Sequence, residues 1–239
     1  MMVSVAELRR DADASAVDKL QFAHWMWRYQ KPTYAEWVQH VEDALVHQVT
    51  EMVRLKHHVR KHGEDGLTAQ VLQGLRMLSL DARMEAVGGN CDVTVSFANE
   101  YLWLGEAKLA TGPEWVFEGY NQLTTRYATG LPNQSAGGML IYCTQTPSNV
   151  FMAQWRASLE ADLTDSVFED HGTLASAFWN TDRVPATGEA IRVLHLPFPL
   201  FQAPQEGIRK FSDQARKAGR KARKAAKNAT SGPDKGAQG

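Results

Sequence analysis

Two neighbouring strand-like segments constrain this chain more than any other feature. They cover residues 90–97 and 101–108, and they carry apolar residues on both sides of their charges. The connection between them, Ala98-Asn99-Glu100, is short enough for a β-hairpin. The sequence therefore predicts two antiparallel strands, with the start of the first beside the end of the second.

The charged residues of this hairpin lie where its two ends would meet. Asp92 opens the first strand, and Glu106 and Lys108 close the second. Because side chains alternate between the two faces of a strand, Glu106 and Lys108 project to one side and Ala107 to the other. We therefore expect two carboxylates and an ammonium group at one end of a sheet. This arrangement suits a magnesium ion and a water that attacks a phosphate.

The rest of the sequence predicts an α/β fold around the hairpin. We expect helices over residues 4–29, 34–61 (closed by Gly63 and Gly66), 68–80 and 113–128, and strands over 82–87, 91–97, 101–107 and 139–143. Helix, three strands, helix, strand is the order of a compact α/β core with helices on the sheet faces. Beyond Pro147 we expect a helix over 151–163, a strand over 191–196 and an irregular exit at Pro197, Pro199 and Pro204.

Length and composition bound the organisation. With 239 residues, 44% of them hydrophobic, the chain can bury a core as one domain with appendages. We predict a helical subdomain over 1–66, an α/β domain over 67–206 and a tail over 207–239. No apolar run approaches the roughly 18–20 residues of a membrane helix. The N-terminus has no signal-peptide pattern, and Cys91 and Cys143 fall in predicted core strands, so we expect reduced thiols and a cytoplasmic protein.

Charge is distributed unevenly along the chain. Residues 209–239 carry ten basic and two acidic residues, a net charge of +8, which leaves −9 on the other 208 residues. A dense basic run is the usual electrostatic footprint of nucleic-acid binding. The alternative is a solvated tail that folds back on the acidic body. The basic residues of the run are Arg209, Lys210, Arg216, Lys217, Arg220, Lys221, Arg223, Lys224 and Lys227.

These features resemble the PD-(D/E)xK nuclease superfamily, which has the restriction-endonuclease-like fold. The resemblance covers about residues 67–143. It rests on Asp92, on Glu106-Ala107-Lys108 fourteen residues later, and on a following helix that carries Gly119-Tyr120-Asn121-Gln122-Leu123. The order of helices and strands matches that fold too, so residues 67–206 would be the nuclease-like domain. Trp-Leu-Gly-Glu-Ala-Lys, followed by Gln-Leu-Thr-Thr-Arg-Tyr, is similar in phrasing to branches found in bacterial restriction and phage-defence cassettes.

The resemblance implies a role for each residue. Asp92 and Glu106 would hold Mg²⁺ or Mn²⁺ together with the backbone carbonyl of Ala107, because Mg²⁺ prefers oxygen ligands. Lys108 would position or deprotonate the attacking water, or offset the phosphate charge. Gln122 would face the site from its helix.

Four positions depart from the family's pattern or extend it. Cys91 replaces the proline that usually precedes the aspartate, and Gln70 stands on the first-helix face where many relatives carry a glutamate. Tyr127 follows Gln122 by five residues. Some exonuclease branches have a tyrosine four residues after the glutamine, so this spacing argues against an exonuclease. Glu85 is a candidate third carboxylate from the first strand, with a plain surface carboxylate as the alternative.

Each assignment has a structural alternative. A solvated hairpin would show the same acidic pair and lysine, and Gln122 would suit a helix surface equally well. The histidines between residues 40 and 62 lack the cysteine or acidic partners of a zinc site. We expect four tryptophans to be core residues rather than platforms for bases, namely Trp25, Trp27, Trp37 and Trp155.

The leading interpretation is a Mg²⁺-dependent endonuclease that acts on DNA in a bacterial restriction or anti-phage defence system. A second is a non-catalytic restriction-like module whose N-terminal helices dock other proteins of a defence complex. A third is a nuclease for RNA or recombination intermediates. The intact set of Asp92, Glu106 and Lys108 favours a catalyst over a structural descendant. A homo-oligomer is compatible with each interpretation, and membrane association is not expected.

Overall fold

The computed structural model describes residues 14–86, 90–202 and 217–224. The chain divides into two compact units, Met1–Gln202 and Ala203–Gly239. The first contains a sheet and its helices. The described part of the second is a helix over residues 217–224 with exposed side chains. None of the helices in these ranges is long and apolar enough to cross a membrane.

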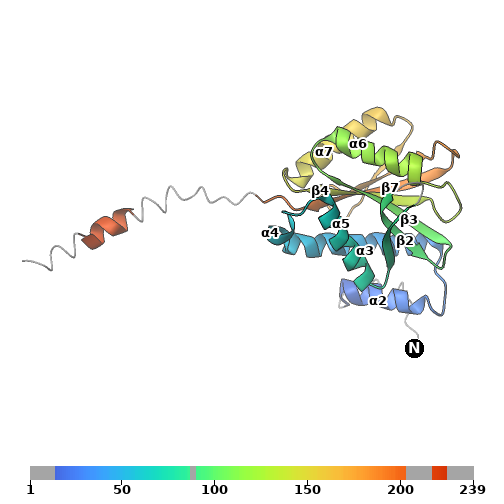
Figure 1. Cartoon of the computed structure of the whole chain (residues 1–239), viewed down its shortest axis with the longest axis horizontal. Coiled ribbons are helices and arrows are strands. Elements are labelled where there is room, and N and C mark those ends of the chain that lie inside the picture. Colours follow the sequence, from blue (N-terminus) through green and yellow to red (C-terminus); the bar gives the residue numbers. More distant parts are fainter. Residues whose placement is uncertain (1–13, 87–89, 203–216, 225–239) are drawn as a thin grey trace, which may run out of the picture. The chain divides into compact units, whose positions relative to one another are not determined.

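A mixed sheet of seven strands lies at the centre of the first unit, in the order β1-β2-β3-β4-β7-β6-β5 (Figure 1). β4 runs parallel to both β3 and β7, and all other neighbours are antiparallel. The strands are β1 (Asp81–Ala86), β2 (Asn90–Phe97), β3 (Tyr101–Leu109), β4 (Ala136–Cys143), β5 (Val167–Asp170), β6 (Phe178–Arg183) and β7 (Ala190–Pro199). The predicted α/β class and the β2–β3 hairpin are confirmed.

Helices cover both faces of this sheet. α6 and α7 lie on one face, and α3 and α5 lie on the other (Figure 1). The helices are α2 (Ala16–Met26), α3 (Tyr34–Arg54), α4 (Lys56–Val59), α5 (Glu64–Met77), α6 (Pro113–Gln122) and α7 (Ser148–Asp162), and a π-helical turn, Leu123–Tyr127, continues α6. The central strands of the sheet thus have helices on both sides.

Neighbouring residues of β3 fill two different hydrophobic cores. Trp103 is fully buried in the cluster that contains Trp37 of α3. Leu104 is 1% exposed and belongs to the cluster that contains Val116 of α6. This alternation follows from the two-residue period of a strand. It confirms that β3 is covered on both faces.

The N-terminal helices share a core with the sheet. Ser15 and Thr33 open α2 and α3, and each forms a capping box with the acidic residue three positions later. Leu20 of α2 and Trp37 of α3 belong to the same cluster as Trp103. The predicted boundary at residue 66 falls inside α5.

The single helix predicted over residues 34–61 is interrupted. α3 ends at Arg54. At the next residue, Leu55, the backbone leaves the helical region with φ −101° and ψ 11°, and α4 is a separate short turn. Gly63 then caps α5 and Gly66 lies inside it, so these glycines begin a helix instead of closing one. α5 begins at Glu64, before the predicted start at residue 68, because acidic residues in its first turn complement the helix dipole.

The region after Pro147 is more regular than predicted. β5 and β6 were not expected, and β7 continues through Pro197 and Pro199. The backbone N–H of Leu200 donates to Cys143 of β4 at 3.0 Å, so the alternation of the strand turns the nitrogen of Pro197 away from β4. On that other side, pairing with β6 ends at His195. Pro197 therefore removes no ladder hydrogen bond.

Candidate active site

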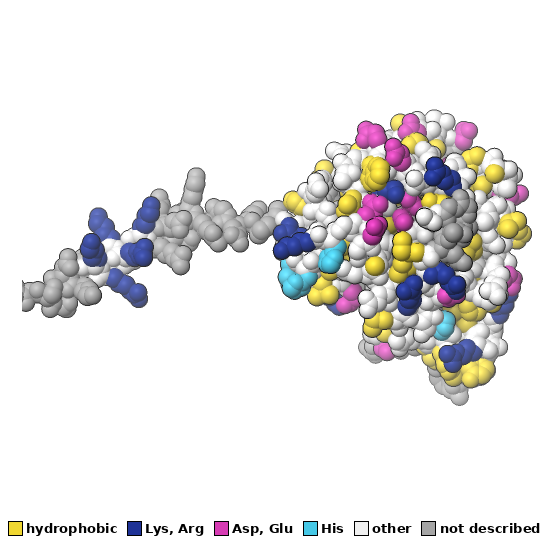
Figure 2. All heavy atoms as spheres, viewed as in Figure 1, with side chains coloured by type: hydrophobic (Ala, Val, Ile, Leu, Met, Phe, Trp, Pro, Cys, Tyr) yellow, Lys and Arg dark blue, Asp and Glu magenta, His cyan; other side chains and the backbone are white. Residues whose placement is uncertain are grey.

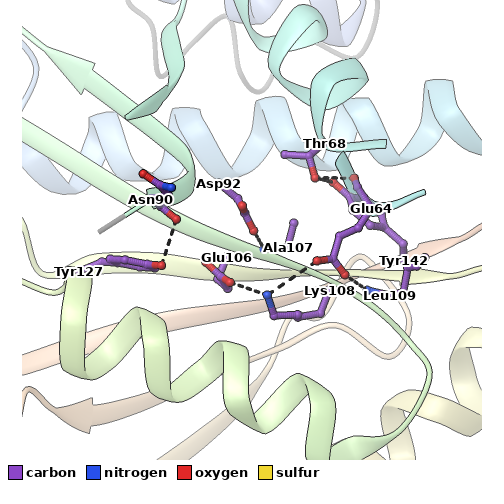
Figure 3. A network of polar contacts seen from close by, with 10 residues as sticks. All are labelled: Glu64, Thr68, Asn90, Asp92, Glu106, Ala107, Lys108, Leu109, Tyr127 and Tyr142. Atoms are coloured by element: carbon purple, nitrogen blue, oxygen red, sulfur yellow. Dashed lines mark hydrogen bonds and ion pairs between the residues drawn. The ribbon is translucent and has the colours of Figure 1, made fainter. Parts of the chain in front are cut away.

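The β2–β3 hairpin brings Asp92, Glu106 and Lys108 together. Asp92 Oδ2 accepts a hydrogen bond from the backbone N–H of Ala107 at 2.9 Å. Lys108 Nζ donates to Glu106 Oε1 at 2.6 Å, and both side chains leave the same face of β3 (Figure 3). Two carboxylates and an ammonium group therefore converge at one end of the hairpin.

Glu64, in the first turn of α5, is a third carboxylate that the sequence alone did not reveal. Its Oε2 accepts a hydrogen bond from the backbone N–H of Leu109 at 2.7 Å, and its Oε1 lies 3.7 Å from Lys108 Nζ (Figure 3). Many relatives carry a glutamate on the helix before the three strands. Here that helix is α5, and its acid is Glu64 instead of a residue at the position of Gln70. Gly63 followed by acidic residues is a helix-start signal, but the predicted helix began after it.

α6 sets the path of the Lys108 side chain. A Cβ on Gly119 would lie 2.8 Å from Lys108 Cε and 2.9 Å from its Cγ, so the absence of a side chain there gives the lysine its space. One turn earlier, the ring centroid of Trp115 lies 5.4 Å from Lys108 Nζ, within cation–π range. Gly119 and Trp115 are four residues apart and so share a helix face.

Glu106 carries an unusual buried oxygen. The residue is 2% exposed, and its Oε2 has no hydrogen-bond partner among the described residues. Burial raises the pKa of Glu106 to about 7, the hydrogen bond from Lys108 opposes this shift, and the charge of Asp92 adds to it. Because a buried carboxylate oxygen without a partner is unfavourable, a cation at this position would be stabilising.

The remaining charges make the site electronegative. Burial raises the pKa of Asp92 despite the hydrogen bond from Ala107. Burial lowers the pKa of Lys108, but the hydrogen bond to Glu106 and the surrounding carboxylates outweigh it, so the net shift is upward. In the view of Figure 2, acidic side chains are grouped near the middle of the visible surface of the first unit. Carboxylates that outnumber the ammonium repel a phosphate unless a cation is bound.

The donor set fits Mg²⁺ or Mn²⁺. Within the described ranges, no group of three or more His, Cys, Asp or Glu side chains is placed to hold a metal ion. Magnesium, however, is commonly held by one or two carboxylates with waters and the substrate phosphate, and Mn²⁺ has similar preferences. Asp92 and the unpartnered Oε2 of Glu106 fit this chemistry. A contribution from the carbonyl of Ala107 stays a prediction.

A π-helical turn follows α6 and lies between Gln122 and Tyr127. Ala128 N donates to Leu123 O at 2.9 Å, an i→i+5 bond, so residues five apart lie one turn apart here. The five-residue spacing therefore does not argue against an exonuclease. Tyr127 Oη donates to the carbonyl of Asn90 at 3.0 Å (Figure 3). Gln122 is half-buried at the end of α6, and its catalytic role stays a prediction.

The other candidates on the sheet are only partly placed. Glu85 lies on β1 opposite Cys91, but its side chain is outside the described residues, so its role as a ligand stays a prediction. Cys91 and Cys143 are free, buried thiols, as predicted. Cys91 Sγ lies 3.4 Å from the carbonyl of Gly105, so it joins β2 to β3 where the family usually has a proline.

The tryptophans divide differently from the prediction. Trp27, Trp37 and Trp155 are buried, as predicted. Trp25 is not a core residue, since it is 48% exposed. It lies on the surface of α2, where its indole contacts the exposed ring of Tyr29. The one-turn distance between these residues creates a surface cluster that needs no burial.

The basic run is partly described. Five of its residues lie in the helix over 217–224 and are exposed, namely Lys217, Arg220, Lys221, Arg223 and Lys224. The other four fall outside the described residues, namely Arg209, Lys210, Arg216 and Lys227. Exposed basic side chains can contact phosphates, so this surface suits nucleic-acid binding. The contact itself stays a prediction.

Comparisons of the chain with protein-family models, with curated proteins and with solved structures found no match. The function is therefore inferred from the geometry and chemistry of the site.

Proposed function

We propose that this protein is a metal-dependent nuclease that hydrolyses the phosphodiester bonds of DNA. The observation that carries the proposal is the convergence of Asp92, Glu106 and Lys108 at one end of a hairpin, with Glu106 Oε2 buried and unpartnered. Buried carboxylates with raised pKa values around a charged partner are typical of functional sites. A cation bound between these carboxylates and a phosphate would explain why the charged groups lie together.

The residues divide the chemistry between them. Bound Mg²⁺ would lower the pKa of a water and neutralise charge on the phosphate. Asp92 and Glu106 would hold the ion, and the N–H of Ala107 orients Asp92. Because the pKa of Lys108 is shifted upward, its ammonium stays protonated and donates to the water or to a phosphate oxygen. Glu64 and Glu106 hold that ammonium between them (Figure 3).

Two features of the sequence bear on the substrate and on the cellular setting. DNA is favoured by the basic run, whose described residues are exposed. Within the PD-(D/E)xK superfamily, the sequence is most similar to branches found in bacterial restriction and phage-defence cassettes. This similarity favours a cytoplasmic endonuclease of such a system.

A plasmid assay tests the proposal. Purified full-length protein should nick supercoiled plasmid with Mg²⁺ or Mn²⁺ and not with a chelator. Asp92→Ala and Glu106→Ala should lose activity and metal binding. Lys108→Ala should lose activity but keep most of the metal binding, because an ammonium group cannot ligate a cation. Glu100→Gln is a matched control, since Glu100 is an exposed carboxylate at the turn of the same hairpin and pairs with Lys31.

The outcomes separate the alternatives. Full activity in folded Glu106→Ala protein, free of contaminating nuclease, would refute the site. Cleavage of RNA but not of plasmid would move the substrate to RNA. Degradation of linear DNA alone would indicate an exonuclease. A folded wild type that cleaves none of these with either metal would favour the non-catalytic module.

A further inference from the structure

Trp115 is the residue of the site with no role so far. It lies in the first turn of α6 and is 44% exposed. Three other tryptophans of the chain, Trp37, Trp103 and Trp155, are fully buried. A single exposed aromatic ring is common on protein surfaces, so the case for a role of Trp115 rests on its position beside Lys108.

The position of Trp115 points to what that role is. Its ring centroid is 5.4 Å from Lys108 Nζ, so the indole borders the group that would meet the phosphate. The neighbouring backbone of α6 is in close contact with Lys108 at Gly119, which fixes the helix relative to the lysine. A nucleotide whose phosphate binds at Lys108 would therefore have the indole beside it.

We propose that Trp115 is a stacking platform for an unpaired nucleobase beside the scissile phosphate. The proposal rests on the nuclease function proposed above and deepens it. Bases stack on exposed aromatic rings with little regard to sequence. Within a duplex both faces of a base are already covered, so stacking on Trp115 needs a base that is extruded or single-stranded. The preferred substrate is therefore a single strand or a locally opened duplex.

The competing role is that Trp115 only positions Lys108 through the cation–π contact. The two roles differ in what they change. Loss of a stacking platform weakens substrate binding, by about 5- to 150-fold per base. Loss of a positioning contact lowers kcat and leaves binding unchanged.

The test compares wild type with Trp115→Ala and Trp115→Phe, with Trp25→Ala as the control. Trp25 is also an exposed tryptophan, at 48%, but lies on α2. Each full-length protein is tested with an intact single-stranded oligonucleotide and with a series of oligonucleotides that each lack one base. The abasic position differs from one member of the series to the next. KM and kcat are measured with Mg²⁺. The Kd is measured by fluorescence anisotropy with Ca²⁺ in place of Mg²⁺, because Ca²⁺ also takes oxygen ligands and the site needs a bound cation to accept a phosphate.

We expect Trp115→Ala to raise KM and Kd about 5- to 150-fold, with Trp115→Phe close to wild type and Trp25→Ala unchanged. One abasic position should weaken binding to wild type and have no further effect on Trp115→Ala, because the platform is already missing.

Three results would overturn the proposal. The first is an unchanged KM and Kd in Trp115→Ala. The second is a lower kcat with unchanged KM, which would assign Trp115 to positioning Lys108. The third is an equal effect of every abasic position on wild type and Trp115→Ala. If wild type cleaves nothing, the nuclease function fails, but the anisotropy arm still decides whether Trp115 stacks.

Discussion

Glu64 Oε2 accepts a hydrogen bond from the backbone N–H of Leu109 at 2.7 Å, across 45 residues of sequence. This bond joins the first turn of α5 to the end of β3, one residue beyond Lys108. It leaves Glu64 Oε1 3.7 Å from Lys108 Nζ. The charge balance of the site therefore depends on α5 as well as on the hairpin.

Glu64→Gln tests this dependence. The amide oxygen can still accept the hydrogen bond from Leu109, but the negative charge beside Lys108 is lost. We expect a stable protein with a nuclease rate lower by about 10- to 100-fold, as for other residues that orient metal-site groups. The measurement is the initial rate against Mg²⁺ concentration. Glu51→Gln changes a partly exposed acid of α3 that pairs with Arg54 and should have little effect. Equal rates for Glu64→Gln and wild type would contradict this role.

Gly119→Ala tests the space reserved for Lys108. The new Cβ would lie 2.8 Å from Lys108 Cε and 3.0 Å from Met139 Cε. Alanine is the better helix former by about 1 kcal/mol, so we expect little loss of Tm. A displaced lysine should still lower the nuclease rate, by up to about 100-fold. Gly66→Ala is the control, because its Cβ would meet only the side chain of His62. The prediction fails if both alanine variants are equally active.

Leu104→Ala tests the core beneath the site. Leu104 is 1% exposed and packs with the α6 cluster. Truncation of a buried leucine should lower the free energy of unfolding by about 2–5 kcal/mol, measured by urea denaturation. Leu131→Ala is the control, since Leu131 is 55% exposed. An unchanged midpoint for Leu104→Ala would mean that β3 is not covered on this face.

His195 is held neutral in a buried polar chain. Its Nδ1 accepts from Trp155 Nε1 at 3.0 Å, so Nε2 carries the proton and donates to Asn180 Oδ1 at 2.8 Å. Asn180 in turn donates to Tyr120 Oη. A second proton on Nδ1 would face the N–H of Trp155. Burial lowers the pKa of His195 from 6.5 to about 3.

This shift predicts a pH dependence of stability. Because the pKa is lower in the folded state, the unfolded state binds the proton more readily below pH 6.5. The contribution of neutral His195 to the free energy of unfolding is fully present above pH 6.5 and is lost as the pH falls toward 3. At pH 5 the loss is about 2 kcal/mol. Glu42, whose pKa burial raises to about 7, acts in the opposite direction. The measurement is therefore the difference between wild type and His195→Gln in urea denaturation at pH 7 and pH 5. A difference that does not change with pH would contradict the shift.

Truncation after Gln205 tests the basic run. The described helix over 217–224 is exposed and carries five basic residues and no acid. If about four to six charges of the run meet phosphates, log K should fall against log salt with a slope steeper by about 4 to 5 in the full-length protein. Matching slopes would show that the run does not bind the DNA backbone. The fold-back or partner-docking interpretation would then be preferred.

The sequence by itself determined the local structure. The two-residue alternation of a strand is a local property, so Glu106 and Lys108 could be assigned to one face and Trp103 and Leu104 to opposite faces. The hairpin turn is also local, and it was enough to predict that Asp92 would lie beside Glu106. The α/β class followed from the order of such segments.

Only the tertiary structure decided which distant residues complete the site. Glu64 meets Lys108 because α5 packs against the sheet, and Trp115 and Gly119 meet it because α6 covers β3. The i→i+5 turn that precedes Tyr127 and the burial of Asn180 in β6 have no local sequence period. These contacts depend on packing between segments far apart in the chain, and a pattern read along one segment carries no information about the partner that will cover it.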